Sequence, residues 1–234
     1  MPMIPWWALV SSSCAPVVLI AGWVIAASLQ PAGYDAMVQS ISALAAQGAT
    51  DRWVMTGALY LLGVCHAVTA LGLRAASMAG RIALACGGAA SIMVGLSPEP
   101  GGGGTTVRHL VSTGVGFTAI AVWSTLATVP HNPPVWALRR TVGYAITALM
   151  AVGAAWFLLE LHGHGVPGLA ERILTAAQST WPLVVAAACA AEQLRASASM
   201  AVTMASTAAT ATGARRAAAA TEPDQAFQTG QAPQ

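Results

Sequence analysis

Charged side chains are scarce in this 234-residue chain: they make up 8% of the residues, while 56% are apolar. Soluble domains average about 25% charged residues, so a water-soluble fold of this length could not cover its surface. The chain contains no lysine, and its net charge of +2 is too small to indicate nucleic-acid binding. The composition therefore excludes an ordinary soluble domain and favours a membrane protein.

The cysteines give no sign of a metal site or of disulfides. The sequence has four cysteines and no CxxC or Cys/His spacing typical of a metal site. All four lie inside long apolar runs, where they are expected to pack as small apolar side chains rather than form disulfides. They are Cys14, Cys65, Cys86 and Cys189.

Long apolar runs dominate what is present. Since about 20 helical residues span the hydrocarbon core, five of the six runs reach the required length, and the third, with Gly87 and Gly88, is shorter. The runs lack the alternation of barrel strands, so the sequence predicts helices, which satisfy their own backbone groups in lipid. The predicted fold is all-α, an integral membrane bundle of six transmembrane helices, at residues 6–29, 53–73, 82–96, 110–129, 141–159 and 173–191.

The arginines predict the orientation, because cytoplasmic loops carry an excess of basic residues. Seven arginines fall on one predicted side of the membrane, whereas three fall on the other side among acidic residues. This asymmetry places both termini in the cytoplasm. The seven are Arg74, Arg81, Arg139, Arg140, Arg195, Arg215 and Arg216, and the three are Arg52, Arg108 and Arg172.

Two domains are predicted. Residues 1–195 form the six-helix transmembrane domain, and residues 196–234 form an Ala/Thr/Gln-rich cytoplasmic tail that lacks the large apolar residues of a core and should be disordered. The richness in Ala, Gly, Val and Arg is typical of a GC-rich bacterial genome, so the expected location is a bacterial plasma membrane.

The longest predicted connection, residues 30–51, is called loop one. Met37, Ile41 and Leu44 follow helical spacing, which predicts a short amphipathic helix lying along the outer surface. Thr50 and Asp51 are predicted to cap the second span.

Three segments carry a family resemblance through their order and spacing. They are Ser-Ile-Ser-Ala-Leu at 40–44, Pro-Glu-Pro at 98–100 with a glycine-rich turn before His109, and Gly-Leu-Ala-Glu-Arg-Ile at 168–173 with Trp181 beyond it. Over roughly residues 10–195 the chain resembles a prokaryotic family of six-span membrane proteins known only as domain of unknown function number nine hundred and ninety-eight. The resemblance implies an integral membrane protein and no particular reaction.

Polar residues gather at the predicted outer face. Arg52, Arg108 and Arg172 stand at three outward helix starts, where free N–H groups and guanidinium groups together favour anions. One interpretation is a shared site for a lipid head group or small anion, in which Arg108 contacts the anion. The alternative is that acids cap the helices and arginines anchor at the interface. The candidate ligand-binding residues are Ser40, Ser42, Asp51, Arg52, Glu99, Arg108, His109, Glu171 and Arg172.

Three other sets of residues could carry chemistry. His66 lies near the middle of the second span. One interpretation is a proton relay or a haem ligand, and the alternative is a neutral imidazole hydrogen-bonded to a neighbouring helix. His162 and His164 are weak candidates for zinc. A hydrolase built on Ser42, His109 and Glu99 would need these groups within hydrogen-bond reach. No cofactor is predicted.

The leading hypothesis is a non-enzymatic protein that binds a lipid or small anionic amphiphile at the outer cluster. A wider version of this hypothesis is that the protein also moves the ligand across the bilayer. A membrane-embedded lipid-modifying enzyme and a structural partner subunit are the alternatives. A metal in the histidine loop or a buried Ser–His contact would favour the enzyme, and a bundle without a groove would favour the subunit. The sequence indicates no nucleic-acid partner and sets no oligomeric state.

Overall fold

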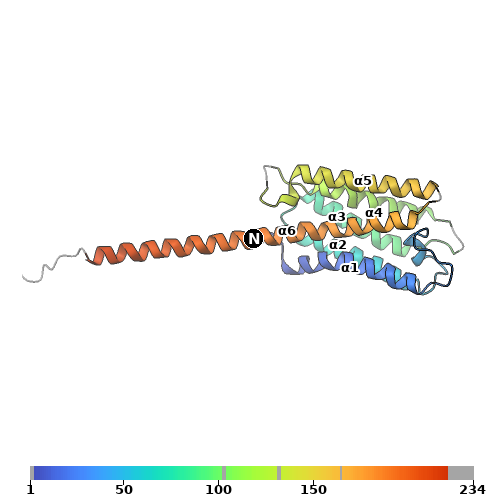
Figure 1. Cartoon of the computed structure of the whole chain (residues 1–234), viewed down its shortest axis with the longest axis horizontal. Helices are drawn as coiled ribbons and strands as arrows, with labels where there is room; N and C mark the ends of the chain where they lie inside the picture. Colours follow the sequence, from blue (N-terminus) through green and yellow to red (C-terminus); the bar gives the residue numbers. More distant parts are fainter. Residues whose placement is uncertain (1–2, 102–103, 131–132, 164, 221–234) are drawn as a thin grey trace, which may run out of the picture. The chain divides into compact units, whose positions relative to one another are not determined.

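The structure is a computed structural model that describes residues 3–101, 104–130, 133–163 and 165–220. The chain divides into two compact units, Met1–Glu192 and Gln193–Gln234. The first contains the helical bundle and all the candidate site residues that lie in the described ranges (Figure 1).

Six α-helices in the described ranges are long and apolar enough to cross a membrane, which confirms the all-α, six-span prediction. Two short 3-10 helices, η1 and η2, lie in the connections. The α-helices are α1 Trp6–Ser28, α2 Trp53–Gly72, α3 Met78–Leu96, α4 Val107–Leu126, α5 Arg140–Gly163 and α6 Pro167–Ala220, with η1 at Ser42–Ala45 and η2 at Trp136–Leu138.

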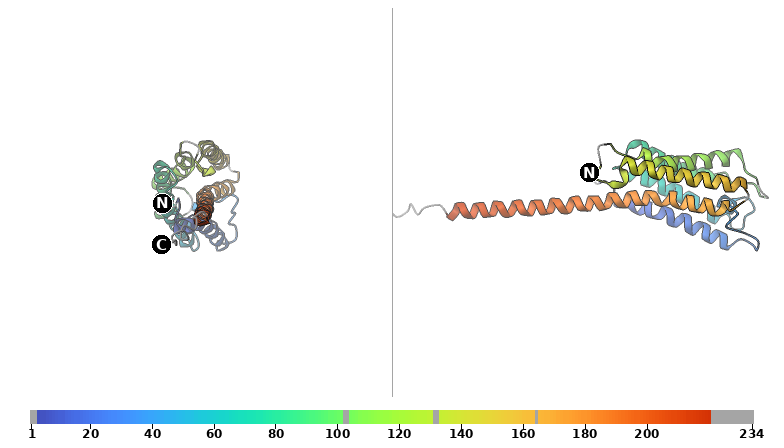
Figure 2. Two further views of the ribbon diagram at one scale, coloured as in Figure 1. Left: turned by 90° about the vertical axis from the view of Figure 1, so that its left-hand side faces the viewer. Right: turned by 45° about the horizontal axis from the view of Figure 1, so that its top comes forward.

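The helices of the first unit run side by side in alternating directions (Figure 2). At one end, the Gln47 N–H donates to the Glu99 carbonyl at 2.8 Å and the Leu169 N–H to the Met37 carbonyl at 3.0 Å, so loop one joins the α3–α4 and α5–α6 connections. At the other end, the Ser77 N–H donates to the Ala127 carbonyl at 3.2 Å. The side of the membrane on which each end lies stays a prediction.

The start of α3 differs from the sequence prediction. The helix begins at Met78, four residues before the predicted start, with Ser77 as its N-cap. The charge of Arg81 is accommodated because its guanidinium donates to the carbonyls of Ala70 at 2.7 Å and Leu71 at 2.9 Å, at the C-terminal end of α2. With 19 residues, α3 is therefore long enough to span.

Loop one does not form the predicted surface helix. Its helical part is the short η1, and both Ile41 and Leu44 are buried against the bundle. The predicted cap is also wrong: Arg52 occupies the N-cap of α2 and its side chain makes no capping hydrogen bond, and Asp51 adopts a positive φ of 46°. The surface helix does not form because Glu171 and Arg172 of α6 bond the loop's backbone at Ala36, Gln39 and Ile41.

The sequence predicts a disordered tail, whereas residues 196–220 are helical, and residues 194–217 are exposed. Alanine has the highest helix propensity, and the threonines bond within their own helix, as Thr203 Oγ1 does to the Ser199 carbonyl at 3.0 Å. Residues 221–234 of the predicted tail lie outside the described residues.

Small residues permit close helix packing. Gly63 of α2 faces Gly88 of α3, and a Cβ at Gly63 would collide with the Gly88 carbonyl oxygen and with Ile92. In lipid, helices associate through such close contacts rather than through hydrophobic burial. The glycines therefore set the distance between α2 and α3.

We expect Gly63→Ala to destabilise the detergent-solubilised protein by about 1–3 kcal/mol, because the added methyl group meets backbone that cannot move aside. Gly57→Ala is the matched control on the same helix, where a Cβ has open space. Thermal unfolding measures both. Equal melting temperatures for the two variants would contradict the close crossing.

Candidate functional site

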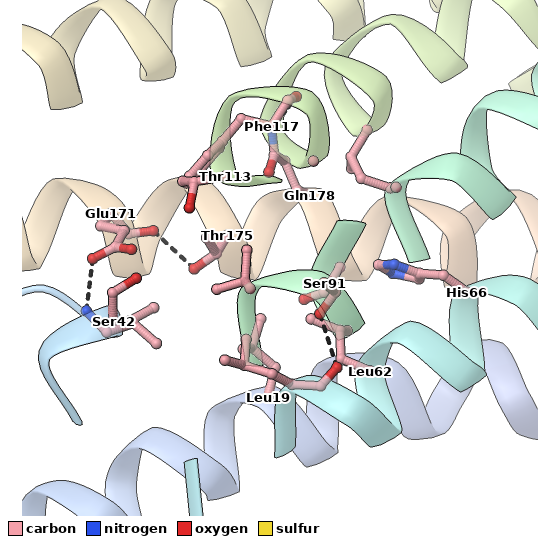
Figure 3. A pocket seen from close by; sticks show the side chains of 17 residues that line it. Leu19, Ser42, Leu62, His66, Ser91, Thr113, Phe117, Glu171, Thr175 and Gln178 are labelled. Atoms are coloured by element: carbon pink, nitrogen blue, oxygen red, sulfur yellow. Dashed lines mark hydrogen bonds between the residues drawn. The ribbon is translucent and has the colours of Figure 1, made fainter. Parts of the chain in front are cut away.

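A cavity lies inside the bundle, between loop one and helices α1, α2, α3, α4 and α6 (Figure 3). Its empty volume is about 650 Å³, counting the space at its open side. Apolar side chains form much of the wall, and polar side chains stand at intervals along it. The lining residues are Leu19, Ile41, Ser42, Leu59, Leu62, His66, Gly87, Ser91, Val94, Thr113, Gly116, Phe117, Ile120, Glu171, Thr175, Gln178 and Ser179.

Glu171 and Ser42 lie at one end of the cavity, and His66 lies toward the other end (Figure 3). Glu171, on the first turns of α6, is 5% exposed, and its Oε2 accepts the Ile41 N–H at 2.7 Å. This hydrogen bond fixes the backbone of loop one directly before Ser42. A buried carboxyl group thus both lines the cavity and positions its hydroxyl neighbour.

Ser42 contacts His109 of α4. His109 is 5% exposed, with its Nε2 3.1 Å from the Ser42 Oγ and its Nδ1 2.8 Å from the Ser97 carbonyl oxygen. A carbonyl can only accept, so Nδ1 carries the proton. In the neutral ring, Nε2 therefore accepts the hydrogen bond of the serine hydroxyl.

Glu99 lies beside the same imidazole nitrogen. Its Oε1 is 3.5 Å from the His109 Nε2. Burial raises the pKa of Glu99 above its usual value, and the neighbouring His109 acts in the opposite direction. The structure thus brings three predicted residues, Ser42, Glu99 and His109, into one contact group.

Arg172 binds loop one rather than the cavity. Its guanidinium donates to the carbonyls of Ala36 at 2.6 Å, Gln39 at 2.9 Å and Gly168 at 2.9 Å, and to the Tyr34 hydroxyl at 2.7 Å. Burial raises the pKa of Tyr34, partly offset by the Arg172 charge, so the hydroxyl stays neutral. The arginine therefore acts as a main-chain clamp.

The other predicted residues lie apart from the cavity. The Arg52 Nη1 donates to the Ala45 carbonyl at 3.3 Å, and the Ser40 Oγ accepts the Ala43 N–H at 3.1 Å. Asp51 and Arg108 are exposed. Within the described residues, neither Asp51–Arg52 nor Glu171–Arg172 forms an ion pair. Two of the three guanidinium groups are thus engaged by backbone carbonyls.

The imidazole ring of His66 is buried without a hydrogen-bond partner among the described residues. It is 3% exposed and lines the cavity, and neither ring nitrogen has a hydrogen-bond partner among the residues that the structure describes. The Thr113 hydroxyl on the cavity wall is in the same condition. Buried polar groups are nearly always hydrogen-bonded, so these two groups indicate where the cavity can accept a polar ligand group.

Sequence reasoning missed the polar residues of α6. Thr175 and Gln178 follow Glu171 at the i, i+4, i+7 positions, so they share one helix face. The Gln178 Nε2 donates to the Phe117 carbonyl at 3.2 Å. A polar stripe on an otherwise apolar span was the available signal.

The predicted histidine loop gives little support for zinc. The His162 ring is exposed, and its Nδ1 lies 2.7 Å from the Leu158 carbonyl oxygen. His164 lies outside the described residues. In the described ranges no group of three or more His, Cys, Asp or Glu side chains could hold a metal.

We expect Arg172→Ala to destabilise the protein by about 3 kcal/mol, because four acceptors lose a charged donor. Arg108→Ala is the control, since that side chain is exposed, and it should leave the melting temperature of the detergent-solubilised protein nearly unchanged. If the two variants unfold at the same temperature, Arg172 does not clamp loop one.

The comparisons with known proteins identify a family but assign no function. No curated protein matches the chain, and neither does any solved structure. The model of the family described as protein of unknown function, DUF998, matches residues 13–188. This range contains most of α1, all of α2 to α5, the cavity-lining part of α6 and the Ser42–His109 contact, and the chain belongs to the DUF998 family.

Proposed function

We propose that this multi-pass membrane protein binds a single-chain amphiphile in the bundle cavity, with the polar head group near Ser42 and Glu171. The observation that supports this proposal is a cavity with a largely apolar wall and polar side chains toward both ends. Such a cavity favours a binding protein over a structural subunit. The bundle end formed by loop one is the outer end if the arginine asymmetry sets the orientation.

The cavity favours a neutral polar head group. Glu171 is the acidic residue of its wall, and among the described residues no arginine lines it. An anionic head group would therefore meet a buried carboxyl group, while the nearby Arg172 guanidinium is engaged by loop one. Hydroxyl or amide groups can instead donate to Glu171 and exchange hydrogen bonds with Ser42. This chemistry replaces the anion site that three arginines suggested.

The apolar wall suits an alkyl chain. Leu59 and Leu62 of α2 and Phe117 and Ile120 of α4 supply bulky apolar surface between the polar groups. Each methylene group transferred from water to such a surface contributes about 0.8 kcal/mol. The gain is smaller for a ligand that arrives from lipid, so the hydrogen bonds at the two ends provide the selectivity.

His66 supports a ligand with a second polar group along its chain. An unbonded imidazole in a low-dielectric interior costs about 1–3 kcal/mol relative to a bonded one. A ligand hydroxyl or carbonyl beside His66 would recover this free energy. The cavity therefore fits an amphiphile with a polar head and a second hydrogen-bonding group.

We expect a monoacylglycerol to raise the melting temperature of the purified protein more than a lysophosphatidate of the same chain length. Thr113→Phe should abolish the stabilisation by filling the cavity, whereas Thr118→Phe, at an exposed site on the same helix, should retain it. Thermal unfolding in detergent measures both probes. Equal responses of the two variants would contradict binding in the cavity, and a stronger response to lysophosphatidate would contradict the neutral head group.

We expect His66→Leu to leave the ligand-free protein equally stable or more stable, because it removes an unsatisfied buried group. The same change should weaken binding of a hydroxylated fatty alcohol about tenfold, the equivalent of one hydrogen bond. The corresponding plain alcohol should bind both forms equally. A loss of stability without ligand would show that His66 has a structural partner.

A further inference from the structure

Ser42 and His109 meet the geometric requirements of a nucleophile and its general base. The hydroxyl lies 3.1 Å from the Nε2, within the range of 2.6–3.2 Å expected for such pairs. The Nδ1 proton is held by the Ser97 carbonyl at 2.8 Å, which keeps the Nε2 lone pair directed at the serine. Both side chains are buried, so bulk water does not compete for the contact.

Ser42 also reaches the cavity. It lines the wall, whereas His109, its hydrogen-bond partner, is not among the lining residues. A molecule in the cavity can therefore approach Ser42 while the imidazole holds the hydroxyl proton. The local backbone keeps this arrangement, because the Glu171 carboxyl bonds the N–H of Ile41, the residue before Ser42.

We infer that Ser42 is a catalytic nucleophile and His109 its general base, and that the pair hydrolyses a long-chain carboxylic ester bound in the cavity. This inference rests on the proposed amphiphile-binding function. It adds an activity that membership of the DUF998 family does not assign.

The reaction balances with water as the co-reactant. The Ser42 Oγ attacks the acyl carbon while its proton passes to the His109 Nε2, and the imidazolium then protonates the departing alcohol. Water attacks the acyl-serine, giving its proton to the Nε2, which returns it to the Ser42 Oγ. The products are one carboxylic acid and one alcohol for each ester and water consumed.

Glu99 is placed to act through His109 as a positioning residue. Its Oε1 lies 3.5 Å from the Nε2, the atom that gains the proton. Its carboxyl group thus lies, like the acid of a hydrolase triad, beside the imidazole that carries the proton during the reaction. Here the acid approaches the same nitrogen as the serine, and the Ser97 carbonyl takes the orienting role at Nδ1.

The experiment uses full-length protein in detergent and an alkyl fluorophosphonate, in which attack by an activated serine forms an O–P bond and releases fluoride. We expect mass spectrometry to locate the adduct on Ser42. Ser42→Ala should abolish the adduct at that position, and His109→Gln should slow labelling at least about 10²-fold. Hydrolysis of a long-chain p-nitrophenyl ester should fall in the same two variants.

Ser13→Ala is the matched control, because that hydroxyl bonds the Leu9 carbonyl of its own helix. It should leave labelling and hydrolysis unchanged. Labelling at another serine, or ester hydrolysis that survives Ser42→Ala, overturns the inference. Adduct mapping on the unmodified protein decides the matter even if His109→Gln does not fold.

Monoacylglycerol binding separates this inference from the proposed function. If the unmodified protein and Ser42→Ala both bind the monoacylglycerol but Ser42 is not labelled, the hydrolase is wrong and the binding function stands. If the monoacylglycerol stabilises neither the unmodified protein nor Ser42→Ala, which cannot hydrolyse it, the binding function itself is wrong.

Discussion

The buried hydrogen bonds between the start of α6 and the main chain of loop one are the interaction on which the site depends. In a membrane, an unpaired backbone group costs several kcal/mol, so an irregular segment needs partners within the protein. Glu171 accepts the Ile41 N–H, and Arg172 donates to the carbonyls of Ala36 and Gln39. With its backbone held in this way, the loop packs Leu44 into the bundle and presents Ser42 to both His109 and the cavity.

Local sequence determined most of the helices, and tertiary contacts determined the exceptions. The apolar runs gave the six spans because length and hydropathy act within each segment. The start of α3 was misplaced because Arg81 interrupts the run, and its guanidinium is bonded by the Ala70 and Leu71 carbonyls of α2. The surface helix predicted around Met37 failed for the same kind of reason, since side chains of α6 bond the loop's backbone.

The candidate site was predictable in membership but not in arrangement. Ser42, Glu99, His109 and Glu171 were all selected as polar residues at the same membrane face, yet they come from three separate parts of the chain. Their distances follow from how loop one folds over α4 and α6, which no local pattern encodes. For the arginines, charge and a helix start suggested an anion site, and in the structure the Arg172 guanidinium is engaged by main-chain carbonyls.

The hydrogen bonds between arginine guanidinium groups and backbone carbonyls bear on which ligand the cavity would select. Arg172 and Arg52 bond carbonyl oxygens, and neither lines the cavity, whose wall contains the acid Glu171. For the proposed function, this arrangement favours a neutral ligand over an anionic one. Among the described residues no arginine lines the cavity, which suits the inferred ester hydrolysis better than phosphoryl transfer, in which cations normally stabilise the transferred group. The hydrogen bonds by which α6 holds loop one thus link the fold to the proposed polarity of the cavity and to the inferred chemistry of Ser42.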